Sequence, residues 1–222
     1  MSQLKVDSVM LEFNDRKILQ DVWLQCSQGE IVGLLGRNGC GKSSLLKIIF
    51  GSLKAQYSYV SIDGQPIDKG YYHQKIAYLP QHNFFPKDIR IEKLSKVLVD
   101  DRFRDEFTAL DIYKNFSHKK AGQLSGGELR QLETLMILYN KADFILMDEP
   151  FTHISPVQSD GFKALIHRVA EVKGIIITDH QYYNILDVSD RIILIENGVT
   201  RHITNNEELV TYNYLRGANV QP

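Results

Sequence analysis

Short, almost entirely apolar runs recur along this chain and alternate with segments whose apolar residues return at intervals of three and four. The runs have the length of strands and few polar positions, which is typical of strands buried on both faces of a parallel sheet. The segments between them predict helices packed against that sheet. The predicted strands span residues 30–35, 59–62, 75–79, 144–148, 174–178 and 191–196, and the predicted helices span residues 44–50, 125–139, 156–172 and 181–188.

Turn residues mark two antiparallel hairpins beside this alternation. Asn14-Asp15 joins predicted strands at residues 6–13 and 18–26, and Asn197-Gly198 precedes a predicted strand at residues 199–202. Asn, Asp and Gly tolerate the positive φ angles that tight hairpin turns require. The N-terminal part of the chain is therefore expected to contribute antiparallel strands.

The stretch from residue 91 to about residue 116 contains neither Gly nor Pro and carries many charges. Its apolar residues lie at helical spacing, at Ile91, Leu94, Val97, Leu98, Phe103, Phe107 and Leu110. This pattern predicts a small helical subdomain inserted into the chain. Because strands and helices alternate on both sides of the insertion, we expect right-handed crossovers and a mostly parallel sheet.

Composition and charge narrow the possible classes of protein. The chain has 222 residues, 43% of them hydrophobic, and 26 Lys+Arg against 27 Asp+Glu give a net charge of −1. These values exclude a disordered chain, a collagen-like repeat and a disulfide-rich miniprotein. The balanced charge argues against a broad nucleic-acid-binding face, so no nucleic-acid partner is expected. No apolar run approaches the roughly 20 residues that span a bilayer.

The first residues and the cysteines indicate the compartment. The N-terminus carries charges where a signal peptide needs an apolar stretch. Cys26 and Cys40 fit no zinc spacing and are too few for a disulfide framework. We therefore expect a cytosolic chain with two reduced thiols, for which any membrane role requires a partner that spans the membrane.

The most specific motif lies between a predicted strand and a predicted helix. Residues 36–43, Gly-Arg-Asn-Gly-Cys-Gly-Lys-Ser, match the pattern G-x-x-x-x-G-K-[ST] of a phosphate-binding loop. Its glycines let backbone N–H groups converge on a phosphate, and the helix start adds the positive end of a dipole. Lys42 is expected to contact the β- and γ-phosphates and Ser43 to bind Mg²⁺. An ordinary Gly-rich turn is the less favoured alternative, because the strand and helix supply the context that confirms the motif.

A second motif is an apolar strand that ends in two acids, Asp148 and Glu149. Ligands of parallel sheets bind at the carboxyl ends of strands, so Asp148 is expected beside the phosphate loop, where it can hold Mg²⁺ through water. Side chains alternate along a strand, so Glu149 points elsewhere. It can polarise an attacking water and receive its proton. The alternative is a solvated acidic turn before Pro150.

A third motif, Leu-Ser-Gly-Gly-Glu at residues 124–128, resembles the signature of the ATP-binding cassette (ABC) ATPases. The resemblance covers nearly the whole chain, because the phosphate loop, Gln81, the signature, the acidic strand and His180 follow in the family's order. The runs DEPF at residues 148–151 and TDH at 178–180 are most similar to the lipopolysaccharide-export and branched-chain amino-acid subgroup. The resemblance implies an α/β P-loop NTPase fold. This fold has a RecA-like, mostly parallel sheet flanked by helices, an antiparallel β part at the N-terminus and an inserted helical subdomain.

The resemblance also implies a role for each matching residue. Phe13 matches the aromatic residue that stacks on adenine, Gln81 the glutamine that senses Mg²⁺ and the attacking water, and His180 the histidine on the γ-phosphate. Their plain alternatives are a core or surface aromatic, a solvated loop side chain and a surface histidine. The implied sites comprise catalytic Lys42, Gln81, Glu149 and His180; ATP contacts at Phe13, Gly36, Arg37, Asn38, Gly39, Cys40, Gly41, Lys42, Ser43, Ser44, Ser125, Gly126 and Gly127; and Mg²⁺ ligands Ser43, Gln81 and Asp148.

The resemblance implies one nucleotide-binding domain over residues 1–222, with a core at 1–81 and 143–222 and a helical subdomain at 82–142 that carries the signature. Ser125 and the paired glycines would open a helix toward a γ-phosphate bound by a second copy of the chain. ATP would then join two copies in a two-fold dimer. Its opening and closing would drive a separate membrane-spanning partner, and the chain would lie at the inner face of the cell membrane through that partner.

Two residues depart from the family pattern. Ser155 stands where an Asp usually couples the two sites, and Met136 stands where many relatives have Arg. These departures favour, as one alternative, a regulatory cassette with weak turnover. A second alternative is a soluble ABC ATPase that takes no part in transport; such proteins usually carry two cassettes or a long coiled-coil insertion, and this chain has neither. Because Lys42, both acids and His180 are present, we expect an active ATPase. We also expect Lys42 and the helix N-terminus to lower the pKa of Cys40, so that a thiol reagent inhibits hydrolysis.

Overall fold

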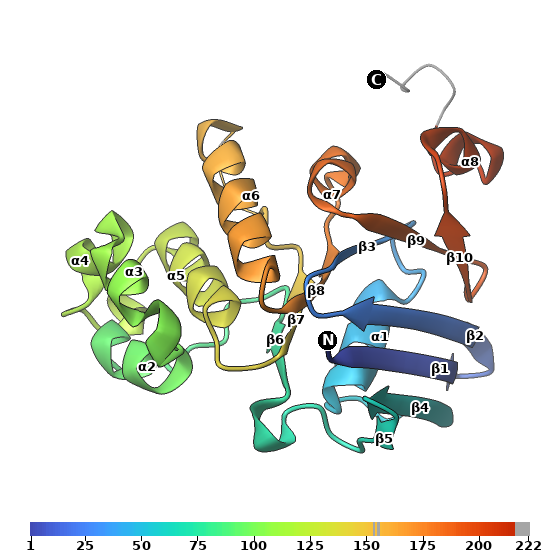
Figure 1. The fold of residues 1–222 in the computed structure, drawn as a ribbon, viewed down its shortest axis with the longest axis horizontal. Helices are drawn as coiled ribbons and strands as arrows, with labels where there is room; N and C mark the ends of the chain where they lie inside the picture. The colour runs from blue at the N-terminus through green and yellow to red at the C-terminus, as the bar shows by residue number, and fades with distance from the viewer. Residues whose placement is uncertain (153, 155, 216–222) are drawn as a thin grey trace.

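The computed structural model describes residues 1–152, 154 and 156–215, which build one ten-stranded sheet with helices on both faces (Figure 1). The strands follow the order β5-β4-β1-β2-β10-β9-β3-β8-β7-β6. The strands are β1 (Gln3–Phe13), β2 (Arg16–Ser27), β3 (Ile31–Gly36), β4 (Tyr57–Ile62), β5 (Gln65–Pro66), β6 (Ile76–Leu79), β7 (Phe144–Asp148), β8 (Gly174–Thr178), β9 (Arg191–Glu196) and β10 (Val199–Ile203). The α-helices are α1 (Lys42–Phe50), α2 (Ile91–Leu98), α3 (Arg104–Ala109), α4 (Asp111–Phe116), α5 (Gly126–Leu138), α6 (Pro156–Ala170), α7 (Tyr182–Val188) and α8 (Asn206–Thr211).

The strands β9, β3, β8, β7 and β6 are parallel and form the half of the sheet that carries the motifs. Every residue of β3, β7 and β8 is buried, because helices cover both faces. Within β7, Phe144 and Leu146 join a core with helix α1, whereas Ile145 and Met147 join a core with α5, α6 and α7. The predicted mostly parallel α/β fold is confirmed, and its strand ends meet at one edge.

The other half of the sheet is antiparallel, as the turn residues predict. β1 pairs with both β2 and β4, and β10 pairs with β9. Asn14 and Asp15 have φ of 47° and 62°, and Asn197 and Gly198 have φ of 50° and 80°, so both turns use the left-handed backbone that these residue types tolerate. A single parallel residue pair, Val199 with Asp21, joins β10 to β2.

Helices α2 to α5 lie together at the side of the sheet away from β1, β2 and β4 (Figure 1). The helical prediction for residues 91–116 is confirmed, although a 3₁₀ turn at Asp101–Phe103 divides it. Ile91, Phe107 and Leu132 of these helices are fully buried in the same apolar cluster as Ile145 of the sheet. The division of the chain into a core and a subdomain stays a prediction. Strand β5 and helix α8 were not predicted, because each is too short to show a period.

In the part of the chain that the structure describes, no helix combines the length and the apolar character needed to cross a membrane.

One buried cation ties the helical region to the sheet. The Lys173 side chain has no exposed surface, and its Nζ donates to the carbonyl oxygens of Asn140 and Ala142, the latter at 2.7 Å. Burial lowers the pKa of Lys173 from 10.5 to about 8. The unfolded chain therefore binds more protons than the folded chain between these two values, so a rise in pH through that window stabilises the fold.

Substitution of Lys173 by Met tests this linkage. Between about pH 7.5 and 9.5, the free energy of unfolding of the wild type should rise by about 2 kcal/mol relative to that of the variant. Urea unfolding of both proteins at both pH values measures this difference, and groups that titrate alike in the two proteins cancel. An identical pH dependence in the two proteins would show that Lys173 does not titrate in this window.

Candidate functional site

The phosphate-loop motif forms the turn between β3 and α1. Gly39 and Gly41 have φ of 77° and 107°, which side chains rarely adopt, and a Cβ on Gly41 would lie 2.8 Å from Leu19 Cδ2. Helix α1 begins directly afterwards, at Lys42. Lys42 Nζ donates to the carbonyl oxygens of Gly36 at 2.7 Å and Arg37 at 3.3 Å, so its charge lies at the mouth of the loop. The loop thus presents backbone N–H groups, a helix N-terminus and an amine together, which favours a phosphate.

Asp148 ends strand β7 beside this loop, as predicted. It is 1% exposed, the Tyr78 hydroxyl donates to its Oδ2 at 3.2 Å, and its carboxyl interacts with the nearby Ser43 hydroxyl. Burial raises the pKa of its carboxyl above the usual value. A carboxylate and a hydroxyl next to a phosphate loop form a donor set that suits Mg²⁺, which usually binds one or two protein oxygens and takes its other ligands from phosphate and water.

The described residues offer no alternative metal centre, because they contain no cluster of three or more His, Cys, Asp or Glu that could hold an ion. The two protein oxygens of Ser43 and Asp148 suit a metal site at which a bound phosphate would supply further ligands. The amide of Gln81, the third predicted Mg²⁺ ligand, hydrogen-bonds Glu149.

Three predicted catalytic side chains meet above the loop. Gln81 Nε2 donates to Glu149 Oε1 at 2.8 Å, and His180 Nε2 lies 2.6 Å from the same oxygen. These residues follow three neighbouring strands, β6, β7 and β8. Glu149 has a φ of 57°, an uncommon backbone for a residue with a side chain, and such strain clusters at functional sites. The arrangement aims one carboxylate, one amide and one imidazole at the same point.

A pocket of about 300 Å³ collects most of the predicted nucleotide contacts. Phe13, whose surface is 49% exposed, lies at its wall, so its ring is available for stacking. The residues that line the pocket are Phe13, Ile18, Asn38, Gly39, Gly41, Lys42, Ser43, Ser44, Gln81, Glu149 and His180. Ser125, Gly126 and Gly127 are absent from this described lining. One chain therefore does not bring its signature to its own phosphate loop.

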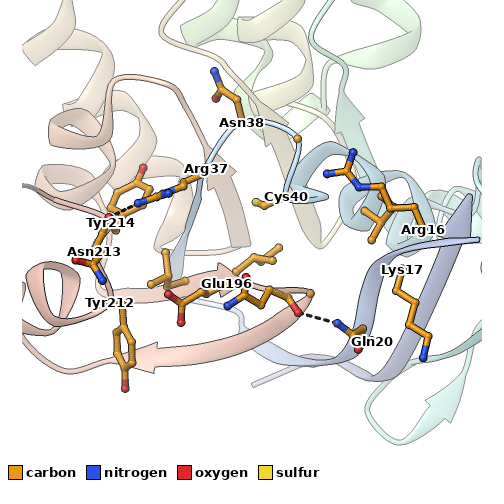
Figure 2. Close-up of a pocket in the computed structure, with 16 residues that line it drawn as sticks. Arg16, Lys17, Gln20, Arg37, Asn38, Cys40, Glu196, Tyr212, Asn213 and Tyr214 are labelled. Atoms are coloured by element: carbon orange, nitrogen blue, oxygen red, sulfur yellow. Dashed lines mark hydrogen bonds between the residues drawn. The ribbon is translucent and has the colours of Figure 1, made fainter.

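A larger pocket of about 560 Å³ lies on the other side of the loop, between the loop, the β9–β10 turn and the segment after α8 (Figure 2). Arg37 and Cys40 line this pocket rather than the smaller one. Arg37 Nη2 donates to the carbonyl oxygen of Asn213 at 2.7 Å, which holds the outer part of the loop against the C-terminal segment. Arg37 therefore ties the loop to the C-terminal segment, and both Arg37 and Cys40 lie on the side of the loop that faces the larger pocket.

The expectation of a low pKa for Cys40 is wrong. Its thiol is partly buried, and burial raises the pKa above 9.0 by more than the nearby Lys42 charge lowers it. The desolvation of a thiolate thus outweighs one cation at this position. The expected sensitivity of hydrolysis to thiol reagents loses its physical basis.

The sequence pattern did not reveal several residues that hold the site together. Asp179 is buried, and its carboxylate accepts from two backbone N–H groups. One belongs to Phe151, just after the two acids, at 3.0 Å, and the other to Gln181, just after His180, at 2.9 Å. Tyr78 holds Asp148, and the Arg130 guanidinium holds the carbonyl of the same residue. For Tyr78 and Arg130 the sequence carries one signal, a polar side chain within a predicted strand or helix, whereas Asp179 lies between a predicted strand and a predicted helix.

The two departures from the expected pattern have different outcomes. Met136 is fully buried among apolar side chains of the helical face, so it acts as a core residue. Ser155 lies outside the described residues.

The sequence of this chain matches a known protein family and named relatives. Residues 19–152 match the sequence profile of the family described as ABC transporter. The lipopolysaccharide export system ATP-binding protein LptB of Haemophilus influenzae is 30% identical over 230 residues, which cover 94% of this chain and 95% of the relative. The manganese transport system ATP-binding protein MntB of Listeria innocua is 27% identical and covers 95% of each chain.

Solved structures share the fold. The ATP-binding subunit of an ABC transporter superimposes with a TM-score of 0.82 at 19% identity, over 96% of this chain and 94% of that chain. A nucleotide-free ATP-binding cassette of an ABC transporter superimposes with a TM-score of 0.73 at 23% identity, over 97% and 96%.

Proposed function

Because this chain belongs to the ABC transporter family as an ATP-binding and ATP-hydrolysing subunit similar to those of lipopolysaccharide export, we propose a role in ATP hydrolysis for each residue of the site. The observation that carries the proposal is the meeting of Gln81, Glu149 and His180 at one carboxylate oxygen above the phosphate loop. A general base needs hydrogen-bond reach to the proton that it takes, and this arrangement aims Glu149 at the place where a γ-phosphate would end.

Each group of the site has its own proposed role in binding or hydrolysing ATP. The loop amides and Lys42 bind the phosphates, and Phe13 stacks on the adenine. Ser43 and Asp148 would hold Mg²⁺, with Gln81 as a further ligand or sensor. When bound, Mg²⁺ neutralises charge on the phosphate oxygens. Glu149 accepts the proton of the attacking water, and His180 orients that water and the γ-phosphate by hydrogen bonding.

The signature completes the site only in a pair of chains. Ser125 caps helix α5, and its hydroxyl and N–H exchange hydrogen bonds with Glu128 in a capping box. The N-terminus of α5 is exposed and would receive the γ-phosphate held by a second copy. Each chain carries both complementary half-sites, the phosphate loop and the signature, so an isologous two-fold dimer joined by two ATP molecules would complete both sites.

The dimer would convert hydrolysis into motion of a separate membrane-spanning partner. This partner would hold the chain at the inner face of the cell membrane. Two relatives are named as ATP-binding proteins of a lipopolysaccharide export system and of a manganese transport system. A transmembrane subunit is therefore the partner that we propose for this chain.

Metal dependence tests the proposed site. The purified chain should turn over ATP with Mg²⁺ and lose this activity in EDTA. Asp148→Asn keeps the side-chain size and should lower turnover by about 100-fold or more, because it removes the carboxylate that holds the ion. Turnover is measured by phosphate release and nucleotide binding by fluorescence. An Asp148→Asn protein as active as wild type would contradict the assignment.

A further inference from the structure

A buried arginine of helix α5 connects two parts of the catalytic site. Arg130 is 2% exposed, and its guanidinium donates from Nη1 to the Pro80 carbonyl at 2.5 Å and from Nη2 to the Asp148 carbonyl at 2.9 Å. A longer contact of 3.4 Å joins Nη2 to the Glu149 carbonyl. Pro80 directly precedes Gln81, so one side chain holds the backbone at both Gln81 and Glu149.

Stability alone does not explain this residue. A guanidinium removed from water loses hydration free energy that hydrogen bonds rarely exceed, and an apolar side chain of similar size would often be at least as stable there. The nearest acid is Glu133, whose Oε2 lies 4.0 Å from Nη1. The Oε1 atom of Glu133 instead accepts from the N–H groups of Phe84 at 2.7 Å and Phe85 at 2.8 Å. Arg130 and Glu133 therefore both hydrogen-bond the backbone close to Gln81, and Arg130 also hydrogen-bonds the end of β7.

The shape of the guanidinium suits the task. Its donors lie in a rigid plane and point in fixed directions, so one arginine can hold two loops at a set separation, whereas a lysine offers a point charge. The support is needed because Glu149 has a left-handed backbone that costs free energy unless its surroundings hold it. The Glu149 N–H also donates to the Thr178 carbonyl at 2.8 Å, so both sides of this residue are tied down.

The same helix begins at the signature. Arg130 follows the capping residue Ser125 by five positions, which corresponds to about 7 Å along a helix. A shift of the helix start on contact with a partner's nucleotide would therefore move the guanidinium, and with it the Pro80 and Glu149 carbonyls.

We propose that Arg130 is a positioning residue that couples occupation of the signature in one chain to the geometry of Gln81 and Glu149 in the same chain. This inference rests on the proposed function, because it requires hydrolysis at Glu149 and an ATP-joined dimer. Arg130 touches no substrate, and it acts through the backbone of the residues that do.

The test compares wild type with Arg130→Lys and Arg130→Met, using the exposed Arg168→Lys as the matched control. We expect kcat to fall about tenfold or more in Arg130→Lys and about 100-fold in Arg130→Met, while KM for ATP and affinity for a non-hydrolysable ATP analogue change less than about twofold. Arg168→Lys should match wild type. Thermal unfolding of each variant distinguishes a protein that no longer folds from a folded protein in which Gln81 and Glu149 are displaced. If Arg130→Met does not fold, Arg130→Lys alone tests the inference.

A double substitution tests the coupling. Gly126→Asp, which blocks the signature, should lower kcat by a factor about tenfold smaller in the Arg130→Lys background than in wild type, because the direct loss at the partner's site remains and only the part transmitted through Arg130 is already gone. The inference would be overturned if Gly126→Asp lowered kcat by the same factor in both backgrounds, or if Arg130→Lys had the kcat of wild type. In either case, turnover by the wild type would leave the proposed function intact. A wild type that binds ATP without hydrolysing it would overturn both.

Discussion

Glu149→Gln is expected to abolish turnover while ATP still binds, with a loss between about 10²- and 10⁴-fold, the range typical of a lost general base. The amide has the size of the carboxylate, so the contacts with Gln81 and His180 can persist, but it cannot accept the proton of the attacking water. Because ATP then stays intact, the nucleotide-joined dimer should accumulate. Phosphate release measures the first effect, and size-exclusion chromatography with Mg²⁺ and ATP measures the second.

Glu171→Gln is the matched control, since Glu171 is exposed and precedes strand β8, at the opposite end of that strand from His180. It should retain wild-type turnover and elution. If Glu149→Gln hydrolysed ATP at the wild-type rate, another group would be the base. If it lost turnover without forming a dimer, the assignment of Glu149 as the general base would hold and the proposed ATP-joined dimer would be contradicted.

Two inactive variants are expected to restore activity when mixed, because each proposed site takes its phosphate loop from one chain and its signature from the other. Lys42→Ala removes the amine at the mouth of the loop. Gly126→Asp adds a carboxylate where a partner's γ-phosphate would lie, and a Cβ at Gly126 meets no atom within 4 Å in the single chain, so the fold accepts it. Each variant alone should lose about 100-fold or more in turnover.

In an equal mixture, half of the dimers contain one chain of each kind, and each such dimer has one intact site of two. The mixture should therefore reach about a quarter of wild-type turnover if the sites work independently. A mixture as inactive as its components would show that one chain supplies both halves of its site, or that one site cannot work without the other. Mass photometry of the mixture with ATP distinguishes these cases by showing whether dimers form.

Local sequence patterns predicted most of the fold and the chemistry that they encode. The apolar runs at β3, β7 and β8 are buried strands, the two Asn-containing turns are hairpins, and the glycines of the phosphate loop adopt the backbone that their spacing implies. These features depend on residues close in the chain, where steric limits and side-chain periodicity act without reference to the rest of the protein. The phosphate loop, the acidic strand end and the family could accordingly be read from one sequence.

Contacts between distant segments were beyond such patterns. The strand order places β6, β7 and β8 side by side, and this order brings Gln81 and His180 to Glu149. Burial reversed the expected pKa shift of Cys40, because desolvation depends on what covers a group and not on its neighbours in sequence. Arg130 had no distinguishing pattern, since its hydrogen-bond acceptors are backbone carbonyls 18 or more positions away. Short-range chemistry thus follows from residue order, whereas desolvation and long-range hydrogen bonds arise when packing brings remote segments together.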